Sequence, residues 1–319
     1  IKAETESVKQ MLKNAIENSV KSGVEVTNLF TNADFTDGFK GWEGKAMTKA
    51  MKSSTTGFTA AECWAKNCDM HQTLTKRNNG VYVLAVNGAY RPYDDRYSTY
   101  YAAQVYLNGN SLYLPTAYET YIPLAEAKDG ENCYITDTGK DDGAVDYEIF
   151  DGQGASTDLI GYAIHRCTSM ANAAAAGRAQ NYLVTLVNDS TLTLGVRNEN
   201  TVPGQDWVGI SNIHVTYYET LKDAEAYIDK TLECMAARAQ GIINFLPSTG
   251  ADYAQHPGCP QELKDKLEEA VKAIATSTTP EQKYALVQTF STLFEQVLEA
   301  RKAYVSMVDE AMVIYNIAQ

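Results

Sequence analysis

The sequence of 319 residues lacks a cluster of basic residues, a long apolar run and a cysteine motif of the kind that holds zinc. Its 27 Lys and Arg are outnumbered by 40 Asp and Glu, which gives a formal net charge of −13. A nucleic-acid-binding surface needs a basic stripe along which phosphates can lie, so this composition argues against nucleic acid as a partner. The same charge balance disfavours an anionic membrane surface and leaves neutral sugars, peptides and cations.

No stretch approaches the ~20 consecutive apolar residues that a membrane-spanning helix needs, so no such segment is expected. The first four residues already belong to a helical pattern, and no initiator Met or signal peptide precedes them. We therefore expect that a targeting segment has been removed. The expected location is extracytoplasmic, either secreted or on the cell surface, with a lipid anchor on the missing N-terminal segment as one route.

The six cysteines show no CxxC pair and no His at zinc spacing, so a metal cluster is not expected. They are either disulfides in an oxidising compartment or buried thiols. Two disulfides fit the predicted elements. One joins Cys234 and Cys259, on either side of a predicted loop between helices, and the other joins Cys133 and Cys167 in the β region.

Nothing in the sequence selects a catalytic site. There is no G-x-S-x-G nucleophile motif and no glycine-rich phosphate loop, and the four histidines are scattered. A glycosidase needs two carboxylates facing one cleft at about 5–10 Å, and no motif marks such a pair. We expect a non-catalytic protein without an organic cofactor.

The middle of the chain, residues 24–220, consists of short alternating or β-branched runs separated by Gly, Asn and Asp clusters. Many short strands with turn signals at this spacing indicate an antiparallel β-sandwich. The clearest predicted strands cover residues 81–86, 101–107, 182–187, 191–196 and 208–218. An Ala-rich run at 170–176 predicts a short helix inside the β region.

Helical periodicity occupies both ends of the chain. Residues 1–23 carry one apolar stripe, and the period returns after Tyr218. Breaks at Pro247, Pro260 and Pro280 divide the C-terminal part, residues 221–319, into three predicted helices over 221–245, 260–275 and 279–319. Short loops between helices predict an antiparallel three-helix bundle, with the N-terminal helix packing on it.

Several segments of the β region occur in an order that carries a resemblance. They are the run 28–35 with Gly41-Trp42, the runs 61–64, 72–74 and 79–82, Tyr90-Arg91, the Ala-rich run with Gly177 and Asn181-Tyr182, and the runs 194–196 and 206–218. Together they resemble the galactose-binding-like, carbohydrate-binding-module-like jelly-roll modules in surface proteins of Bacteroides-type gut bacteria. The run Gly-Ile-Ser-Asn-Ile at 209–213 departs from the Asp-bearing last strand of that group. The resemblance implies a jelly roll and, for many relatives, carbohydrate binding.

Aromatic and charged residues are concentrated in one predicted loop, residues 90–101. Pro92 is expected to end the strand before it. Aromatic faces stack on the C–H face of a pyranose, while Arg and carboxylate groups bond adjacent hydroxyls. The predicted glycan-binding residues here are Tyr90, Arg91, Tyr93, Asp94, Arg96, Tyr97 and Tyr100. The alternative is a structural loop whose charges pair with each other and whose rings pack on the sandwich.

Two further sites carry a functional and a structural interpretation. Trp207 is either a second sugar platform or a ring packed at the sandwich edge. Asp34 and Asp37 are candidate ligands of a structural calcium ion, as is the acidic loop 128–154, although no EF-hand spacing is present. The alternative for these acidic groups is a solvated surface.

Three functions are consistent with the sequence. The first is a secreted or surface protein that binds a neutral or cationic glycan through its sandwich. The second is a structural or adhesive component whose helical bundle contacts another surface protein. The third is a glycan-processing enzyme with an unrecognised carboxylate pair.

Overall fold

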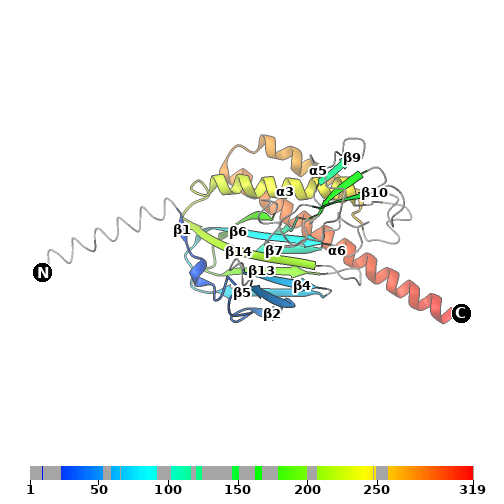
Figure 1. Cartoon of the computed structure of the whole chain (residues 1–319). Helices are drawn as coiled ribbons and strands as arrows, with labels where there is room; N and C mark the ends of the chain where they lie inside the picture. The colour runs from blue at the N-terminus through cyan, green and yellow to red at the C-terminus, as the bar shows by residue number, and fades with distance from the viewer. Residues whose placement is uncertain are drawn as a thin grey trace.

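A computed structural model of the chain describes residues 9, 23–52, 59–64, 66–91, 102–115, 120–123, 146–150, 162–166, 179–199, 207–246, 248 and 258–318. Two antiparallel β-sheets and three α-helices pack around one continuous hydrophobic core (Figure 1). The predicted β-sandwich with a helical part is therefore confirmed. Its jelly-roll connectivity stays a prediction.

The two sheets of the sandwich are antiparallel throughout. The first has the order β12 (Gln180–Val187), β6 (Gly80–Arg91), β14 (Trp207–Tyr218), β4 (Thr59–Trp64) and β3 (Lys49–Lys52), and β1 (Val24–Glu25) also pairs with β14. The second has the order β2 (Glu43–Lys45), β5 (Cys68–Leu74), β13 (Leu192–Asn198), β7 (Ala103–Leu107) and β8 (Asn110–Tyr113). The five clearest predicted strands correspond to β6, β7, β12, β13 and β14.

A third, smaller sheet has the order β10 (Asp146–Phe150), β11 (Tyr162–Arg166) and β9 (Thr120–Pro123). The Ala-rich helix predicted at 170–176 and most of the acidic loop 128–154 lie outside the described residues. So does the N-terminal helix predicted over 1–23, apart from Lys9, which is helical, and Gly23.

Strand β14 contains a β-bulge that reverses which of its residues face the core. Its register against β6 moves from Ser211↔Asn87 to His214↔Ala85, so three steps along β14 match two along β6. Asn212 takes up the extra residue with a φ of +53°, a left-handed conformation that Asn tolerates better than most residues. Asn212 and His214 are consequently exposed on either side of the buried Ile213.

The three predicted C-terminal helices are α3 (Glu225–Phe245), α5 (Gln261–Ala273), which continues as the 3₁₀ turn η3 (Ile274–Thr276), and α6 (Pro280–Ala318). Lys264, in the first turn of α5, donates to the carbonyl of Ile243 near the end of α3 (3.1 Å). These two helices therefore run antiparallel. Lys283, in the first turn of α6, pairs with Asp229 near the start of α3 (2.7 Å), so α3 and α6 run parallel.

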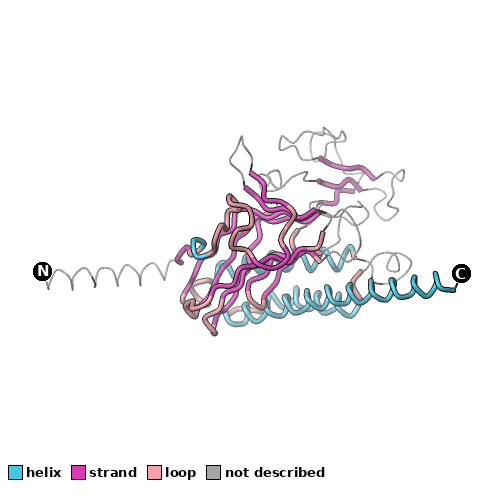
Figure 2. Tube along the Cα trace, turned by 90° about the horizontal axis from the view of Figure 1, so that it is seen from below, coloured by secondary structure: helices cyan, strands magenta, loops and turns pink. Residues whose placement is uncertain are grey.

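The helices lie along one side of the sandwich (Figure 2), where both sheets end in an edge strand. Those edges are β12 in the first sheet and β8 in the second. An uncovered edge strand exposes backbone N–H and C=O groups that template aggregation. Side chains of α6 meet both edges: Tyr284 accepts the N–H of Leu186 on β12, and Ser291 accepts the N–H of Ser111 on β8.

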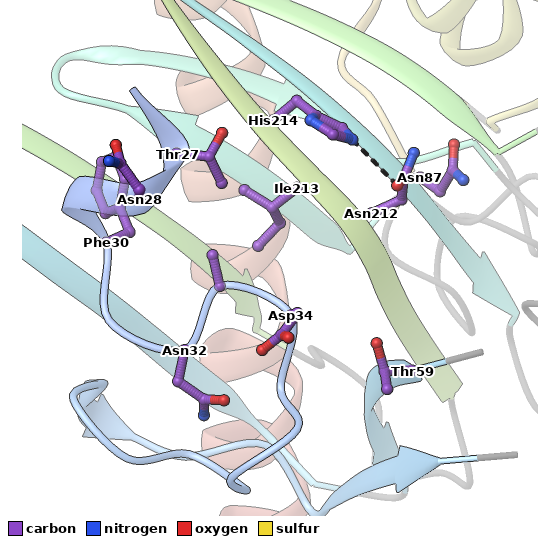
Figure 3. Close-up of a pocket in the computed structure, with 11 residues that line it drawn as sticks. Thr27, Asn28, Phe30, Asn32, Asp34, Thr59, Asn87, Asn212, Ile213 and His214 are labelled. Carbon is purple, nitrogen blue, oxygen red and sulfur yellow. Dashed lines mark hydrogen bonds between the residues drawn. The ribbon is translucent and has the colours of Figure 1, made fainter. Parts of the chain in front are cut away.

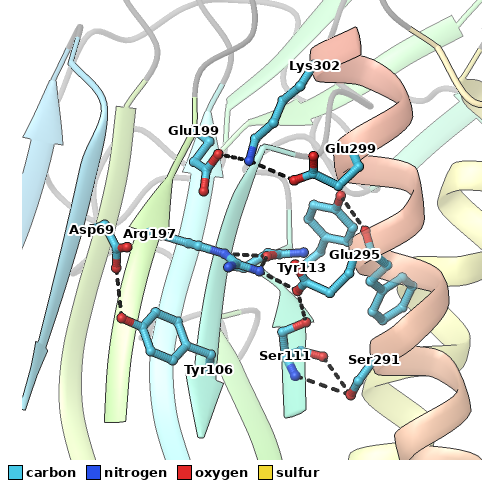
Figure 4. Close-up of polar contacts among 12 residues, drawn as sticks. Asp69, Tyr106, Ser111, Tyr113, Arg197, Glu199, Ser291, Glu295, Glu299 and Lys302 are labelled. Atoms are coloured by element: carbon cyan, nitrogen blue, oxygen red, sulfur yellow. Dashed lines mark hydrogen bonds and ion pairs between the residues drawn. The ribbon is translucent and has the colours of Figure 1, made fainter. Parts of the chain in front are cut away.

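Charged groups extend this contact from β8 to β13 (Figure 4). Arg197 of β13 donates to Gln104 of β7 (2.8 Å from its Nε) and forms an ion pair with Glu295 of α6. The same Glu295 accepts the hydroxyl proton of Ser111 at 2.6 Å. The packing of Tyr113 against Phe294, with ring centroids 5.3 Å apart, lies beside this network. Sandwich and helices thus share apolar and polar contacts.

The predicted disulfide between Cys234 and Cys259 is wrong, because both residues are free thiols. Cys234 lies in the middle of α3, roughly 16 Å along the helix axis from its end at Phe245, given 1.5 Å per residue. Cys259 lies just before α5, next to that end of α3, and a disulfide needs Cα atoms within about 7 Å. The predicted pair of Cys133 and Cys167 lies outside the described residues.

Candidate functional site

The structure places the first two residues of the predicted 90–101 site at the end of β6. The Tyr90 side chain is fully buried, and its backbone N–H donates to the carbonyl of Pro115 at 2.8 Å. Its ring therefore belongs to the core and offers no face to a sugar. Arg91 is the last residue of β6 and pairs in register with Trp207. The other residues predicted there, Tyr93, Asp94, Arg96, Tyr97 and Tyr100, lie outside the described part of the chain.

Trp207, at the start of β14, is 7% exposed. Its indole Nε1 donates to Oε2 of Glu62 on the neighbouring strand β4 at 3.0 Å. A buried ring whose polar edge is satisfied within the sheet matches the packing interpretation of this residue.

A pocket of about 740 Å³ opens beside the β14 bulge, between the loop that follows β1 and the strands β4, β6 and β14 (Figure 3). Four of its side chains are asparagines, contributed by segments far apart in the sequence. The lining residues are Thr27, Asn28, Phe30, Asn32, Ala33, Asp34, Thr59, Asn87, Asn212, Ile213 and His214.

The loop that forms one wall is fastened to both sheets. Towards the first sheet, Val26 donates its N–H to the carbonyl of Val215 on β14, and Val215 donates its own to the Thr27 hydroxyl, both at 2.7 Å. Towards the second sheet, the Gln72 side chain on β5 accepts the N–H of Thr31 (2.9 Å) and donates to its carbonyl (2.8 Å). These contacts with both sheets hold the wall in place.

Asn32 shapes the rest of this loop. Its φ of +53° is left-handed, and its amide donates to the carbonyl of Gly38 (2.8 Å) while accepting the N–H of Asp37 (2.9 Å). The Trp42 indole donates to the Asn32 carbonyl at 3.3 Å. Both ends of this amide are therefore engaged in closing the loop, so Asn32 positions the pocket wall and has little left to offer a ligand.

The two acidic residues predicted as calcium ligands make local contacts. Oδ1 of Asp34 accepts the backbone N–H (3.2 Å) and the hydroxyl (3.0 Å) of Thr36, and Asp37 pairs with Lys40 at 3.1 Å. Within the described ranges, no three His, Cys, Asp or Glu side chains come together as a metal site. Calcium binding by Asp34 and Asp37 stays a prediction.

The pocket combines an apolar floor with a polar rim. Phe30 and Ile213 are 3% and 6% exposed and form the floor. On the rim, Nε2 of His214 lies 3.1 Å from Oδ1 of Asn212. The amides of Asn28 and Asn87 have no hydrogen-bond partner among the residues that the structure describes. Each such amide offers two N–H donors and a carbonyl acceptor to a ligand.

Few charged or nucleophilic side chains occur among the described residues that line the pocket. Asp34 is the one carboxylate among the lining residues, whereas glycoside hydrolysis uses two. The Thr27 hydroxyl donates to Glu25 and accepts the N–H of Val215, so it is held in the backbone framework. His214 lies 3.7 Å from Glu25, but no hydroxyl or thiol nucleophile is hydrogen-bonded to its ring in the described residues.

Some residues of this pocket lie in the sequence segments that carry the resemblance to galactose-binding-like modules. Asn28, Asn32 and Asp34 belong to the first of the resembling segments, and residues 209–213 belong to the last. Of these two segments, the sequence predicted a site only at Asp34, as a calcium ligand, and at Trp207, as a possible sugar platform. The first and last of the resembling segments meet at the pocket, and this resemblance is the sequence signal that could have identified the site. Asn87, in the middle of β6, lies in none of the resembling segments.

No family model matches the chain, and no curated protein matches it. Among solved structures, it is similar to TmCBM61 in complex with β-1,4-galactotriose at 12% identity and a TM-score of 0.28, over 59% of this chain and 96% of that one. The K3 cleaved adhesin domain of Lys-gingipain from Porphyromonas gingivalis is similar at 12% identity and a TM-score of 0.26, over 60% and 99%.

A third similar structure holds CBM51-2 in complex with GlcNAc and INT domains from ZmpB of Clostridium perfringens. It has 10% identity and a TM-score of 0.18, and the match covers 80% of this chain and 41% of that one. Likenesses at these TM-scores carry no conclusion about what this protein binds.

Proposed function

We propose that this protein is a non-catalytic carbohydrate-binding protein, secreted or displayed at the cell surface, whose pocket beside the β14 bulge holds a neutral glycan. The observation that carries the proposal is the pairing of a buried apolar floor, Phe30 and Ile213, with the amides of Asn28 and Asn87, which have no partner among the described residues.

The chemistry of a sugar matches this arrangement. Each hydroxyl both donates and accepts a hydrogen bond, as each amide does, while the C–H groups of the ring suit an apolar floor. The net charge of −13 makes a polyanionic glycan an unfavourable ligand. In the described part of the chain, no helix is long and apolar enough to cross a membrane.

The test is binding of neutral oligosaccharides, first on a glycan array and then by calorimetry, to the wild-type chain and two pocket variants. Asn87→Ala removes one unpartnered amide. Asn212→Gly removes another rim amide and keeps the left-handed backbone that the bulge requires. Loss of a hydrogen bond worth about 0.5–1.5 kcal/mol should weaken binding about 2- to 13-fold in each variant.

The matched control is Asn244→Ala, which removes an exposed amide from α3, far along the chain from the pocket. It should bind as the wild type does. The proposal fails if the wild type binds no neutral glycan, or if both pocket variants bind it with unchanged affinity.

A second function, contact with another surface protein through the helical bundle, has one observation in its favour. The last turns of α6 expose large apolar side chains: Met307, Met312, Val313, Ile314, Tyr315 and Ile317. Exposed apolar groups gathered on one element are typical of interaction sites. An Ile314→Glu, Ile317→Glu double variant should then lose a partner captured by the wild-type chain, and equal capture by both would contradict this function.

A further inference from the structure

Cys63 and Cys68 lie at a point where the chain crosses from one sheet to the other. Cys63 is the fifth residue of β4, in the first sheet, and pairs in register with Val208. Cys68 begins β5, in the second sheet, and pairs with Asn198. Only residues 64–67 separate the two cysteines. This short connection links the two sheets and keeps the two thiols close to each other.

Cys63 and Cys68 are free thiols in this structure, both buried, and their side chains are in contact, unlike those of Cys234 and Cys259. Cys63 and Cys68 are 0% and 1% exposed, and the Cys68 thiol donates a hydrogen bond to the sulfur of Cys63. The Cys63 thiol itself lies 3.0 Å from the carbonyl oxygen of Lys66, to which it donates, and the Thr48 hydroxyl donates to its sulfur at 3.6 Å. Two donors aimed at one sulfur stabilise negative charge on it.

These contacts divide the roles of the two sulfurs. The hydrogen bond from Cys68 lowers the pKa of Cys63 to about 6, against the opposing effect of burial. The same bond, together with burial, raises the pKa of Cys68. In the folded protein, Cys63 is therefore the more readily ionised of the two thiols, and Cys68 the less readily ionised.

We propose that Cys63 and Cys68 are a modification site, at which a disulfide joins the two sheets of the sandwich. The oxidant is a disulfide, either a small molecule such as glutathione disulfide or the active-site disulfide of an oxidoreductase. Before β4 and β5 have packed, the thiolate of either cysteine attacks one sulfur of the oxidant, forms a mixed disulfide and releases one thiolate.

The other cysteine then loses its proton to solvent and attacks the protein sulfur of the mixed disulfide, which releases the second thiolate. The balance is two protein thiols and one oxidant disulfide giving one protein disulfide and two thiols. Because both sulfurs are buried in the folded protein, an oxidant reaches them most readily before β4 and β5 have packed. The bond should thus form during folding and only slowly in the folded, reduced protein.

The experiment uses the fact that Lys66 lies between the two cysteines. The full chain is refolded with glutathione disulfide and reduced glutathione, free thiols are alkylated in denaturant at once, and the protein is digested with trypsin. Cleavage after Lys52, Lys66 and Lys76 separates Cys63, on peptide 53–66, from Cys68, on peptide 67–76. The expected product is these two peptides joined, separating when a reductant is added.

Cys234 and Cys259, free thiols in different parts of the bundle, are internal controls and should be alkylated in the same sample. The reduced, folded chain exposed to the same oxidant should yield the joined peptides at least about tenfold more slowly, as burial slows thiol–disulfide exchange. Complete alkylation of Cys63 and Cys68 after oxidative refolding, or linkage of either to a different cysteine, would overturn the proposal. The readout needs only the wild-type chain, so it does not depend on a variant that folds.

Discussion

The hydroxyl of Tyr284, near the start of α6, accepts a hydrogen bond from the backbone N–H of Leu186 on the edge strand β12 at 2.9 Å. The same hydroxyl accepts a second one from the Asn110 amide on β8 at 3.3 Å. A single side chain of the bundle therefore meets the edges of both sheets. This contact explains how a sandwich with two open edges on one side avoids exposing them.

Replacing Tyr284 with Phe should destabilise the whole chain, because it removes the acceptor and keeps the ring. The Leu186 N–H loses its partner in a site where the tyrosine is 7% exposed, and a buried unsatisfied donor costs about 1–3 kcal/mol. Urea unfolding followed by circular dichroism would measure the change. Tyr315→Phe, on the exposed end of the same helix, should change the free energy of unfolding by less than about 0.5 kcal/mol. Equal effects of both substitutions would contradict this role.

Gly195 on β13 is required by the tyrosine beside it. A Cβ atom at this position would overlap the ring of Tyr106, the residue opposite on β7, and the Tyr106 hydroxyl donates to Asp69 at 2.7 Å. In Gly195→Ala the ring must move and that hydrogen bond is strained or lost, for an expected cost of about 1–3 kcal/mol. The melting temperature of Gly195→Ala should be compared with that of the control Gly109→Ala, where an added Cβ meets nothing within 4 Å. A larger effect at Gly109 would show that the crowding at Tyr106 is not what matters.

The ion pairs of Glu225, with Lys222 just before α3 and with Lys283 of α6, should make stability depend on acidic pH. The Lys222 ammonium, followed by that of Lys283, lowers the pKa of Glu225. A carboxyl group whose pKa is lower in the folded state stabilises above its unfolded pKa and loses that effect as the pH falls through its folded pKa. Glu225→Gln should therefore have a lower urea midpoint than the wild type at pH 7, and the difference should shrink below about pH 4.

The control for this pH effect is Glu233→Gln, an exposed change on the same helix that also removes one negative charge. A difference between wild type and Glu225→Gln that stays constant from neutral to acidic pH would exclude the ion pairs as its source.

The sequence predicted the helices and the main strands because their signals are local. The 3.6-residue spacing of Ile228, Leu232, Met235, Ala239 and Ile242 along α3, all buried, is complete within one segment. The edges that the helices cover depend on strand order, which no local pattern encodes. The Cys234–Cys259 disulfide failed for a related reason, since a cysteine's position within a helix, and not its distance from a loop in sequence, decides what it can reach.

Only part of the pocket could be found from the sequence, for a different physical reason. Apolar residues run through Ile210, Ile213 and Val215, so β14 reads as one continuous strand, and the bulge becomes visible only in the register against Asn87 and Ala85. The concentration of Tyr, Arg and Asp at residues 90–101 predicted a binding site in that loop. The described lining is instead assembled from four separate segments, the loop 27–34, Thr59 of β4, Asn87 of β6 and residues 212–214 of β14.

The sealing of both edge strands by α6 limits how this protein can be divided. A chain ending at residue 220 would keep every strand of the sandwich but uncover the backbone groups of β12 and β8, with Arg197 left without Glu295. The sandwich without its helices is therefore not expected to be stable as a separate domain, either in a fusion protein or in crystals. The sandwich and the helices should melt in one cooperative transition, and the smallest piece suited to ligand studies keeps α6 through Lys302, which pairs with Glu199 after β13.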